Sequence, residues 1–328
     1  GDADAQPYVP GMVEMMKEKG FAHMSEGALV VDVKEDTDTK EIPPCIILKS
    51  DGASLYSTTD LATLVMRMKE NNPDRVIYLA DARQSMHFIQ VFRCARKTGI
   101  VPDTTELVHI GFGTMNGKDG KPFKTRDGGV MRLEYLLKEI DDEMLNKIKE
   151  NQKEKENLNI DEAEAEQTAK TVALAAVKYG DLSNQASKDY IFDIDRFTSF
   201  EGNTGPYILY TIVRIKSILS KYEAKGGDIS ALKDAIMPAV NAGQKNLMLS
   251  LAKFNATIES AYEESAPHKI CAYIYELANA FNGFYHDTKI LSEENEELKK
   301  SYISLLVLTK EILEACIDML GFSAPDRM

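Results

Sequence analysis

The spacing of hydrophobic residues changes near Gly129, and this change limits the fold more than any other feature of the chain. Before Gly129, short apolar runs typical of strands alternate with amphipathic segments typical of helices. The expected strands are 28–33, 45–49, 75–80 and 106–110. The expected helices are 12–19, 56–69 (with Thr58 or Thr59 as its N-cap) and 84–98. Such alternation predicts an α/β unit with a largely parallel sheet.

Beyond Gly129 the expected elements are all helical, which predicts a helical bundle after the α/β unit. The expected helices are 133–155, 161–179, 207–224, 228–237, 240–255, 257–263, 269–286 and 293–319. A break with glycine and proline, residues 200–206, precedes the third of them. The predicted fold class is therefore α/β followed by all-α.

A basic, glycine-rich stretch from Gly111 to Gly129 (GFGTMNGKDGKPFKTRDGG) joins the two parts. Its cationic side chains are Lys118, Lys121, Lys124 and Arg126. Glycine lets backbone N–H groups approach an anion closely, and the cations supply charge where a phosphate would lie. A phosphate-binding loop and a solvated basic loop both remain open. The P-loop pattern fails because Asp119 follows Gly117-Lys118, and the Rossmann pattern fails because Asn116 replaces its third glycine.

Composition excludes several classes of protein. The net charge of −13 argues against a protein that coats nucleic acid indiscriminately, but it leaves room for a local basic face. No window approaches the roughly 18 apolar residues of a membrane helix. The histidines show no HExxH spacing, so we expect no protein-built metal site. The cysteines form no CxxC pair, which favours free thiols in a reducing, cytoplasmic compartment.

Short motifs follow one another along almost the whole chain. They are Tyr56-x-Thr58-x-Asp60, Ala80-Asp81-Ala82-Arg83-Gln84-x-x-His87-Phe88, His109-x-x-Phe112-Gly113, Phe123-Lys124-Thr125-Arg126-x-Gly128, Phe200-Glu201-Gly202-Asn203-Thr204-Gly205-Pro206-Tyr207-x-x-Tyr210 and Asp326-Arg327-Met328. Each is weak alone, but together they resemble arginyl-tRNA synthetase, a class I aminoacyl-tRNA synthetase. The resemblance implies the second half of a Rossmann-like nucleotide-binding fold, followed by a helical anticodon-binding domain.

The resemblance implies a pocket for L-arginine built from Tyr56, Asp60 and Gln84. A planar guanidinium requires a carboxylate and oriented acceptors. Tyr56 and Asp60 are four residues apart, so they share one face if the helix begins near Tyr56. Without the resemblance, Tyr56 would be a packed surface aromatic and Asp60 a first-turn carboxylate on the helix dipole.

For ATP, the resemblance implies contacts from residues at strand ends and in the basic loop. These residues are Asp81, His87, His109, Phe112, Gly113, Lys124 and Thr125. Asp81 would meet the ribose, and His109, Phe112 and Gly113 would line the adenine edge. For His87, a structural role competes with a substrate contact.

The basic loop resembles the Lys-Met-Ser-Lys-Ser signature of class I synthetases, here in the divergent form Lys121-Pro122-Phe123-Lys124-Thr125-Arg126. We expect Lys124 and Arg126, assisted by Lys121, to be catalytic by stabilising charge on the phosphates of ATP. Mg²⁺ would accompany the ATP.

The helical part is implied to bind tRNA-Arg through residues that stack on, or bond to, unpaired anticodon bases. The candidates are Tyr207, Tyr210, Arg214, Tyr285 and Met328. The competing explanation is that aromatic residues at helical spacing belong to the core.

The first class I signature, His-x-Gly-His, is absent from the 328 residues, and the chain starts without Met. We therefore expect a C-terminal fragment of an arginine–tRNA ligase that is inactive alone, from a monomeric enzyme with no DNA or membrane partner. The expected domains are a partial catalytic domain (1–137), a helical connector (138–203) and an anticodon-binding domain (204–328). One alternative is a non-catalytic tRNA-binding or regulatory protein derived from such an enzyme, and another is an unrelated nucleotide-binding α/β protein with a helical interaction domain.

Overall fold

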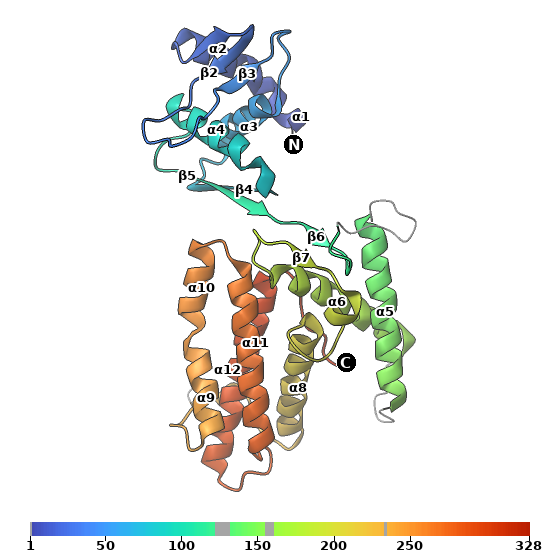
Figure 1. The fold of residues 1–328 in the computed structure, drawn as a ribbon. Helices are drawn as coiled ribbons and strands as arrows, with labels where there is room; N and C mark the ends of the chain where they lie inside the picture. The colour runs from blue at the N-terminus through green and yellow to red at the C-terminus, as the bar shows by residue number, and fades with distance from the viewer. Residues whose placement is uncertain (1, 122–131, 155–160, 233–234) are drawn as a thin grey trace. The chain divides into compact units, whose positions relative to one another are not determined.

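A computed structural model describes residues 2–121, 132–154, 161–232 and 235–328 (Figure 1). The chain divides into two compact units, Gly1–Gly113 and Thr114–Met328. The division into three expected domains stays a prediction.

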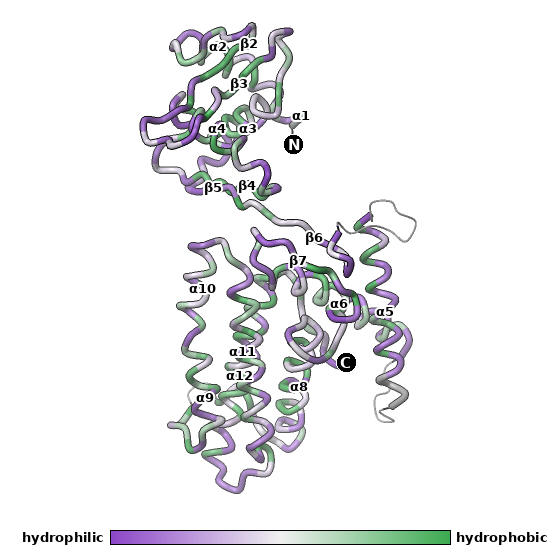
Figure 2. The backbone as a smooth tube through the Cα atoms, viewed as in Figure 1, coloured by the Kyte–Doolittle hydropathy of each residue, from purple (hydrophilic) through white to green (hydrophobic). Residues whose placement is uncertain are grey.

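The first unit combines strands and helices in the order that the hydrophobic pattern predicts, with additional short elements. Its strands are β1 (Ala22–Ser25), β2 (Ala28–Val31), β3 (Cys45–Leu48), β4 (Arg75–Asp81) and β5 (Glu106–Phe112). Its helices are α1 (Asp2–Ala5), η1 (Gln6–Tyr8), α2 (Val9–Glu18), α3 (Tyr56–Glu70), η2 (Ala82–Gln84) and α4 (Ser85–Lys97). In Figure 2 the strands β2 and β3 stand out as hydrophobic.

The expectation of a largely parallel sheet is wrong for the first three strands. β1, β2 and β3 form an antiparallel sheet, and only β4 and β5 pair in parallel. For β1 and β2 the cause is a tight hairpin between them. Glu26 and Gly27 both take positive φ, 50° and 84°, which reverses the chain within two residues. The sequence pattern did not predict β1, because its four residues contain no run of apolar side chains and its two middle residues, His23 and Met24, are exposed.

Helices α3 and α4 provide most of the core of this unit. In α3 the side chains of Leu61 and Leu64 are fully buried, and in α4 those of Val91 and Cys94 are. Residues three or four apart share one face of a helix, so each helix buries one stripe. α3 packs against α4 and β3 and leaves Tyr56, its first residue, exposed.

A half-buried ion pair ties α4 to the acidic turn after β2. Arg93 donates to both carboxylate oxygens of Asp38, at 2.7 and 2.8 Å, and the Glu35 N–H donates to the same carboxylate at 2.8 Å. These bonds lower the pKa of Asp38 from 3.8 to about 2, with Arg93 as the larger cause.

We expect the contribution of the Arg93–Asp38 pair to the free energy of unfolding to be lost in acid. A depressed folded-state pKa means that the stabilisation is complete above pH 3.8 and is lost as the pH falls towards about 2. We expect Arg93→Gln to move the Asp38 titration midpoint, followed by carboxyl NMR, back towards 3.8. An unchanged midpoint would show that the Glu35 N–H alone depresses the pKa.

The second unit is mainly helical. Its longer helices are α5 (Leu133–Glu154), α6 (Glu162–Leu182), α8 (Gly205–Ala224), α9 (Ala242–Ala252), α10 (Phe254–Glu263), α11 (Pro267–Asp287) and α12 (Glu296–Met319). Its short elements are β6 (Met115–Asn116), β7 (Tyr190–Ile191), α7 (Ile194–Phe197) and η3 (Ser230–Leu232). The helix expected at 228–237 is wrong: only the 3₁₀ turn η3 forms there among the described residues, and residues 235–239 have no regular structure. Gly227 and Pro238, which bracket this stretch, both disfavour a continuous helix.

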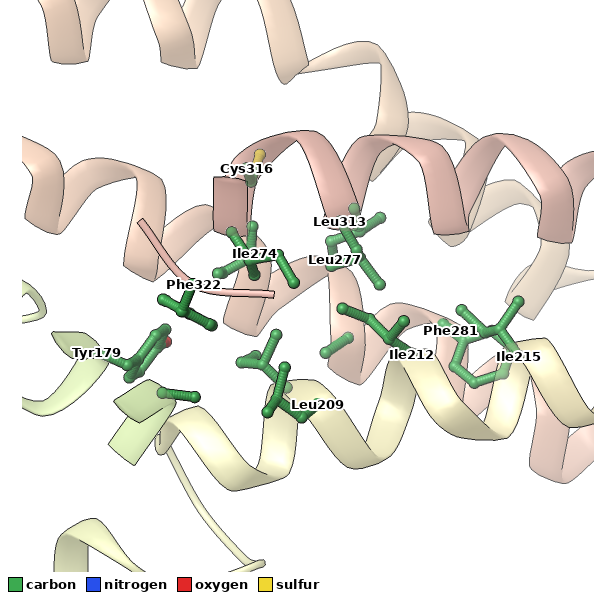
Figure 3. Packing of buried hydrophobic residues seen from close by; sticks show 14 of the residues in the cluster. Tyr179, Leu209, Ile212, Ile215, Ile274, Leu277, Phe281, Leu313, Cys316 and Phe322 are labelled. Atoms are coloured by element: carbon green, nitrogen blue, oxygen red, sulfur yellow. The ribbon is translucent and has the colours of Figure 1, made fainter. Parts of the chain in front are cut away.

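The core of the second unit lies between α6, α8, α11 and α12 (Figure 3). Figure 3 shows Leu209 and Ile212 of α8 facing Ile274 and Leu277 of α11. Tyr179 is fully buried, and its hydroxyl lies 2.5 Å from Asn203 Oδ1 and 2.9 Å from the Cys271 carbonyl oxygen. Both neighbours accept hydrogen bonds, so the one polar atom of this large side chain is satisfied.

Candidate functional site

The first turn of α3 carries the two residues predicted to hold arginine. α3 begins at Tyr56, which places Tyr56 and Asp60 one turn apart on the same side of the helix. Tyr56 is 81% exposed, so it is not part of the core. The predicted N-cap is wrong: the N-cap is Leu55, and Thr58 lies inside the helix.

Thr58 fixes this first turn in place. Its buried hydroxyl accepts from the Leu55 N–H at 2.9 Å and donates to the Ile47 carbonyl of β3 at 2.5 Å. The hydroxyl therefore joins the helix start to the antiparallel sheet. This anchor holds Asp60 at a defined position relative to β3.

Asp60 is paired with His87 from α4. The distance from His87 Nε2 to Asp60 Oδ2 is 2.6 Å, and both side chains are 27% exposed. The His87 ring stands edge-on to Phe88, with 5.1 Å between centroids. His87 was predicted to contact ATP, but the structure places it against the predicted arginine-binding carboxylate. This contact holds the Asp60 carboxylate in a fixed orientation at the start of α3.

Asp81 and Gln84 lie at the carboxyl end of β4. Asp81 accepts from the Arg83 N–H at 2.8 Å, from Arg83 Nε at 2.9 Å and from Nη2 at 2.5 Å. These bonds lower the pKa of Asp81 to about 2, so the carboxylate is ionised at neutral pH. Gln84 ends η2 and is exposed. Asp81 is therefore a charged acceptor whose orientation Arg83 holds.

The parallel pairing of β4 and β5 places the predicted ATP residues beside this end of the sheet. Asp81 is the register partner of Phe112, and Tyr78 is the partner of His109. The His109 ring stacks on Phe88, with 4.5 Å between centroids and 24° between planes. Its Nε2 is buried and has no partner within the described residues. Phe112 is 42% exposed at the strand end, immediately before Gly113.

A close approach of two backbones makes glycine necessary at position 111. A Cβ on Gly111 would lie 2.9 Å from the Cα of Ala82. Real Cβ atoms almost never come so close to backbone. The glycine therefore lets η2, with Gln84 at its end, lie against β5.

From Thr114 onwards, the basic loop belongs to the second unit. Thr114 N–H donates to Asp189 at 2.6 Å, and β6 pairs with β7. Lys118 forms ion pairs with Asp193 at 3.0 Å and Asp195 at 2.9 Å. Lys118 is therefore a tether to α7, a role for which the sequence offered no signal. Lys121 is exposed, with its N–H donating to Asp119, whereas Lys124, Thr125 and Arg126 lie outside the described residues.

A half-exposed aromatic face runs along α8. Tyr207, Tyr210 and Arg214 are half-buried, whereas the opposite face of α8 buries aliphatic residues such as Leu209 and Ile212. The Arg214 guanidinium lies over the Tyr210 ring at 4.8 Å and over the Tyr285 ring at 5.5 Å. Tyr285 is 41% exposed. These residues are therefore not the inner core that aromatic spacing alone would suggest.

The final residues are tied to the bundle. Met328 packs against its core, and Arg327 forms a bidentate pair with Glu164 of α6. Among the described residues, no group of three or more potential ligands could hold a metal ion. Every helix that the structure describes is too short or too polar to cross a membrane.

An α/β unit with an ionised acceptor at its strand ends, followed by a helical unit with a half-exposed aromatic face, is the architecture of a class I aminoacyl-tRNA synthetase. A family model described as "tRNA synthetases class I (R), catalytic domain" matches residues 1–194, and "DALR anticodon binding domain" matches residues 208–328. The chain belongs to the class I arginyl-tRNA synthetase family.

Curated relatives and solved structures agree with this family. An arginine–tRNA ligase of Agathobacter rectalis is 99% identical over the whole chain, which covers 55% of that protein. One from Alkaliphilus oremlandii is 53% identical, with 54% of it covered. The chain thus spans about half the length of the curated relatives it matches.

Two solved structures align with the whole chain. An arginyl-tRNA synthetase from Plasmodium falciparum gives a TM-score of 0.83 at 26% identity, with 54% of that structure covered. One from Thermus thermophilus gives 0.82 at 22% identity, with 59% covered, and supports the fold alone.

Proposed function

We propose that this chain forms part of an arginine–tRNA ligase, which activates L-arginine with ATP and transfers it to tRNA-Arg. The observation that carries the proposal is the Asp60–His87 pair near the start of α3, one helical turn from exposed Tyr56. A carboxylate held by one hydrogen bond and still 27% exposed is suited to receive a guanidinium.

In the proposed reaction, Tyr56, Asp60 and Gln84 hold the arginine side chain. The arginine carboxylate attacks the α-phosphate of ATP and pyrophosphate leaves, after which the arginyl group passes to the terminal ribose of tRNA. Asp81 accepts from the ATP ribose, and Lys121, Lys124 and Arg126 stabilise charge on the phosphates. Mg²⁺ enters with ATP as part of the substrate.

The helical unit is proposed to read the anticodon of tRNA-Arg. Tyr207, Tyr210 and Tyr285 offer ring faces or edges, and Arg214 offers a planar cation. A guanidinium-binding carboxylate has no use in a pure RNA binder, which argues against the alternative of a regulatory tRNA-binding protein. A cytoplasmic location remains a proposal, supported by four buried, free cysteines.

Binding of the 328-residue chain to tRNA tests the RNA part of this function. We expect a tRNA-Arg transcript to bind more tightly than a tRNA of another specificity. The logarithm of the binding constant should fall linearly with the logarithm of the salt concentration. Equal binding of both tRNAs across the salt series would contradict anticodon recognition by this chain.

Pyrophosphate exchange tests the catalytic part separately. The 328 residues contain no His-x-Gly-His sequence, so we expect the chain alone to show no arginine-dependent exchange. The full-length ligase serves as the positive control. Measurable exchange by the purified chain would show that it holds a complete adenylate-forming site.

A further inference from the structure

We propose that Asn282 of α11 is a positioning residue that holds Arg214 and Tyr207 in place to meet the anticodon. This inference rests on the proposed tRNA-binding function. The sequence motifs did not single out Asn282. Its role follows from contacts between two helices that are distant in sequence.

The face of α8 that carries the candidates is continuous. Tyr207, Tyr210, Thr211 and Arg214 are spaced by three or four residues, so they form one stripe along the helix. α11 packs beside α8 and places Asn282 against this stripe.

Asn282 bonds to three of the four residues in the stripe. Its Oδ1 accepts from Arg214 Nη1 at 2.8 Å. Its Nδ2 donates to the Tyr207 hydroxyl at 2.9 Å and lies 3.4 Å from Thr211 Oγ1. The Tyr207 hydroxyl in turn donates to Asn279 at 2.6 Å. This pattern also determines the amide orientation, because a flipped amide would turn its NH₂ group towards the guanidinium, which can only donate.

The bond to Arg214 acts together with the aromatic contacts. The Arg214 guanidinium lies over the rings of Tyr210 and Tyr285. These two contacts fix how far the guanidinium lies from each ring, but they leave it free to rotate about the side-chain axis. A hydrogen bond to one Nη atom sets that rotation. The remaining N–H groups then have a defined direction before RNA arrives, which lowers the entropy lost on binding.

The position of Asn282 separates this role from a role in the core. Its neighbours Phe281 and Phe284 are fully buried, whereas Asn282 is half-buried and Tyr285 is exposed. Asn282 therefore lies at the edge of the buried core, where its amide meets polar groups of α8.

The test uses the full-length ligase of Agathobacter rectalis, 99% identical to this chain, with Asn282→Leu at the equivalent position. Leucine has the same branched shape as asparagine and suits a helix, but it removes the hydrogen bonds to Arg214, Tyr207 and Thr211. We expect KM for tRNA-Arg to rise roughly tenfold, because a hydrogen bond to a charged group is lost. We expect kcat and KM for arginine to stay unchanged.

A tRNA-Arg transcript with a substituted anticodon distinguishes positioning from general damage. In the wild-type enzyme, we expect the anticodon substitution to raise KM for the tRNA. In the Asn282→Leu enzyme, we expect the anticodon substitution to raise KM by a smaller factor, because the contact between Arg214 and the anticodon is already weakened. Asn282→Gln, which keeps an amide, should recover part of the loss. Asn255→Leu changes an exposed asparagine of α10 and should have no effect.

An unchanged KM for tRNA-Arg in Asn282→Leu would overturn the inference while leaving the proposed function intact. So would an equal rise in KM for both transcripts together with a lower melting temperature, since that result indicates a structural role. A wild-type enzyme that does not arginylate tRNA-Arg would overturn both the inference and the proposed function.

Discussion

Replacing Asp60 with asparagine in the full-length ligase is expected to raise KM for arginine roughly 100-fold, because the guanidinium loses its charged partner. Asparagine keeps the shape of the side chain and an oxygen that can accept from His87 Nε2, so the first turn of α3 should stay in place. The effect therefore reports charge and not a change of fold. Steady-state kinetics with arginine varied at saturating ATP and tRNA measures it.

Two controls show whether the loss is specific. KM for ATP should change little in Asp60→Asn, because Asp60 is not among the residues proposed to contact ATP. His87→Gln, which offers a neutral donor in place of the imidazole, should raise KM for arginine much less than Asp60→Asn does. A proportional rise in both KM values for Asp60→Asn would contradict the assignment of Asp60 to arginine.

Replacing Gly205 with alanine is expected to lower the free energy of unfolding of the helical unit by about 3 kcal/mol. Gly205 is the first residue of α8 and lies against the backbone of α6. A Cβ there would be 2.3 Å from the Ala175 carbonyl oxygen and 2.6 Å from its carbonyl carbon. Backbone cannot rotate out of the way like a side chain, so α6 and α8 would have to separate.

Gly283→Ala is the matched control for this change. Gly283 lies inside α11, where an added Cβ meets nothing within 4 Å. Alanine is the better helix former, so we expect an increase in stability of about 0.5 to 1 kcal/mol. Urea unfolding followed by circular dichroism compares the two variants. Equal stability of Gly205→Ala and the wild type would show that α6 and α8 do not pack as closely as the structure has them.

The local chemistry of the sequence predicts much of this protein. The strands β2 to β5 and all but one of the expected helices form near their expected positions, because hydrophobic period and glycine or proline breaks act over a few residues. The motifs place Tyr56 and Asp60 on one helix face, since a spacing of four residues decides that without reference to the rest of the chain.

Pairings between distant residues were decided only by the tertiary structure. His87 lies 27 positions from Asp60, Lys118 lies 77 from Asp195, and Asn282 lies 68 from Arg214. The antiparallel order of β1 to β3 is a further case, because apolar runs do not show which strand lies beside which. The sequence alone determined which residues can carry charge, donate or stack. Which of them meet depends on how helices and strands pack, and packing is a property of the whole folded chain.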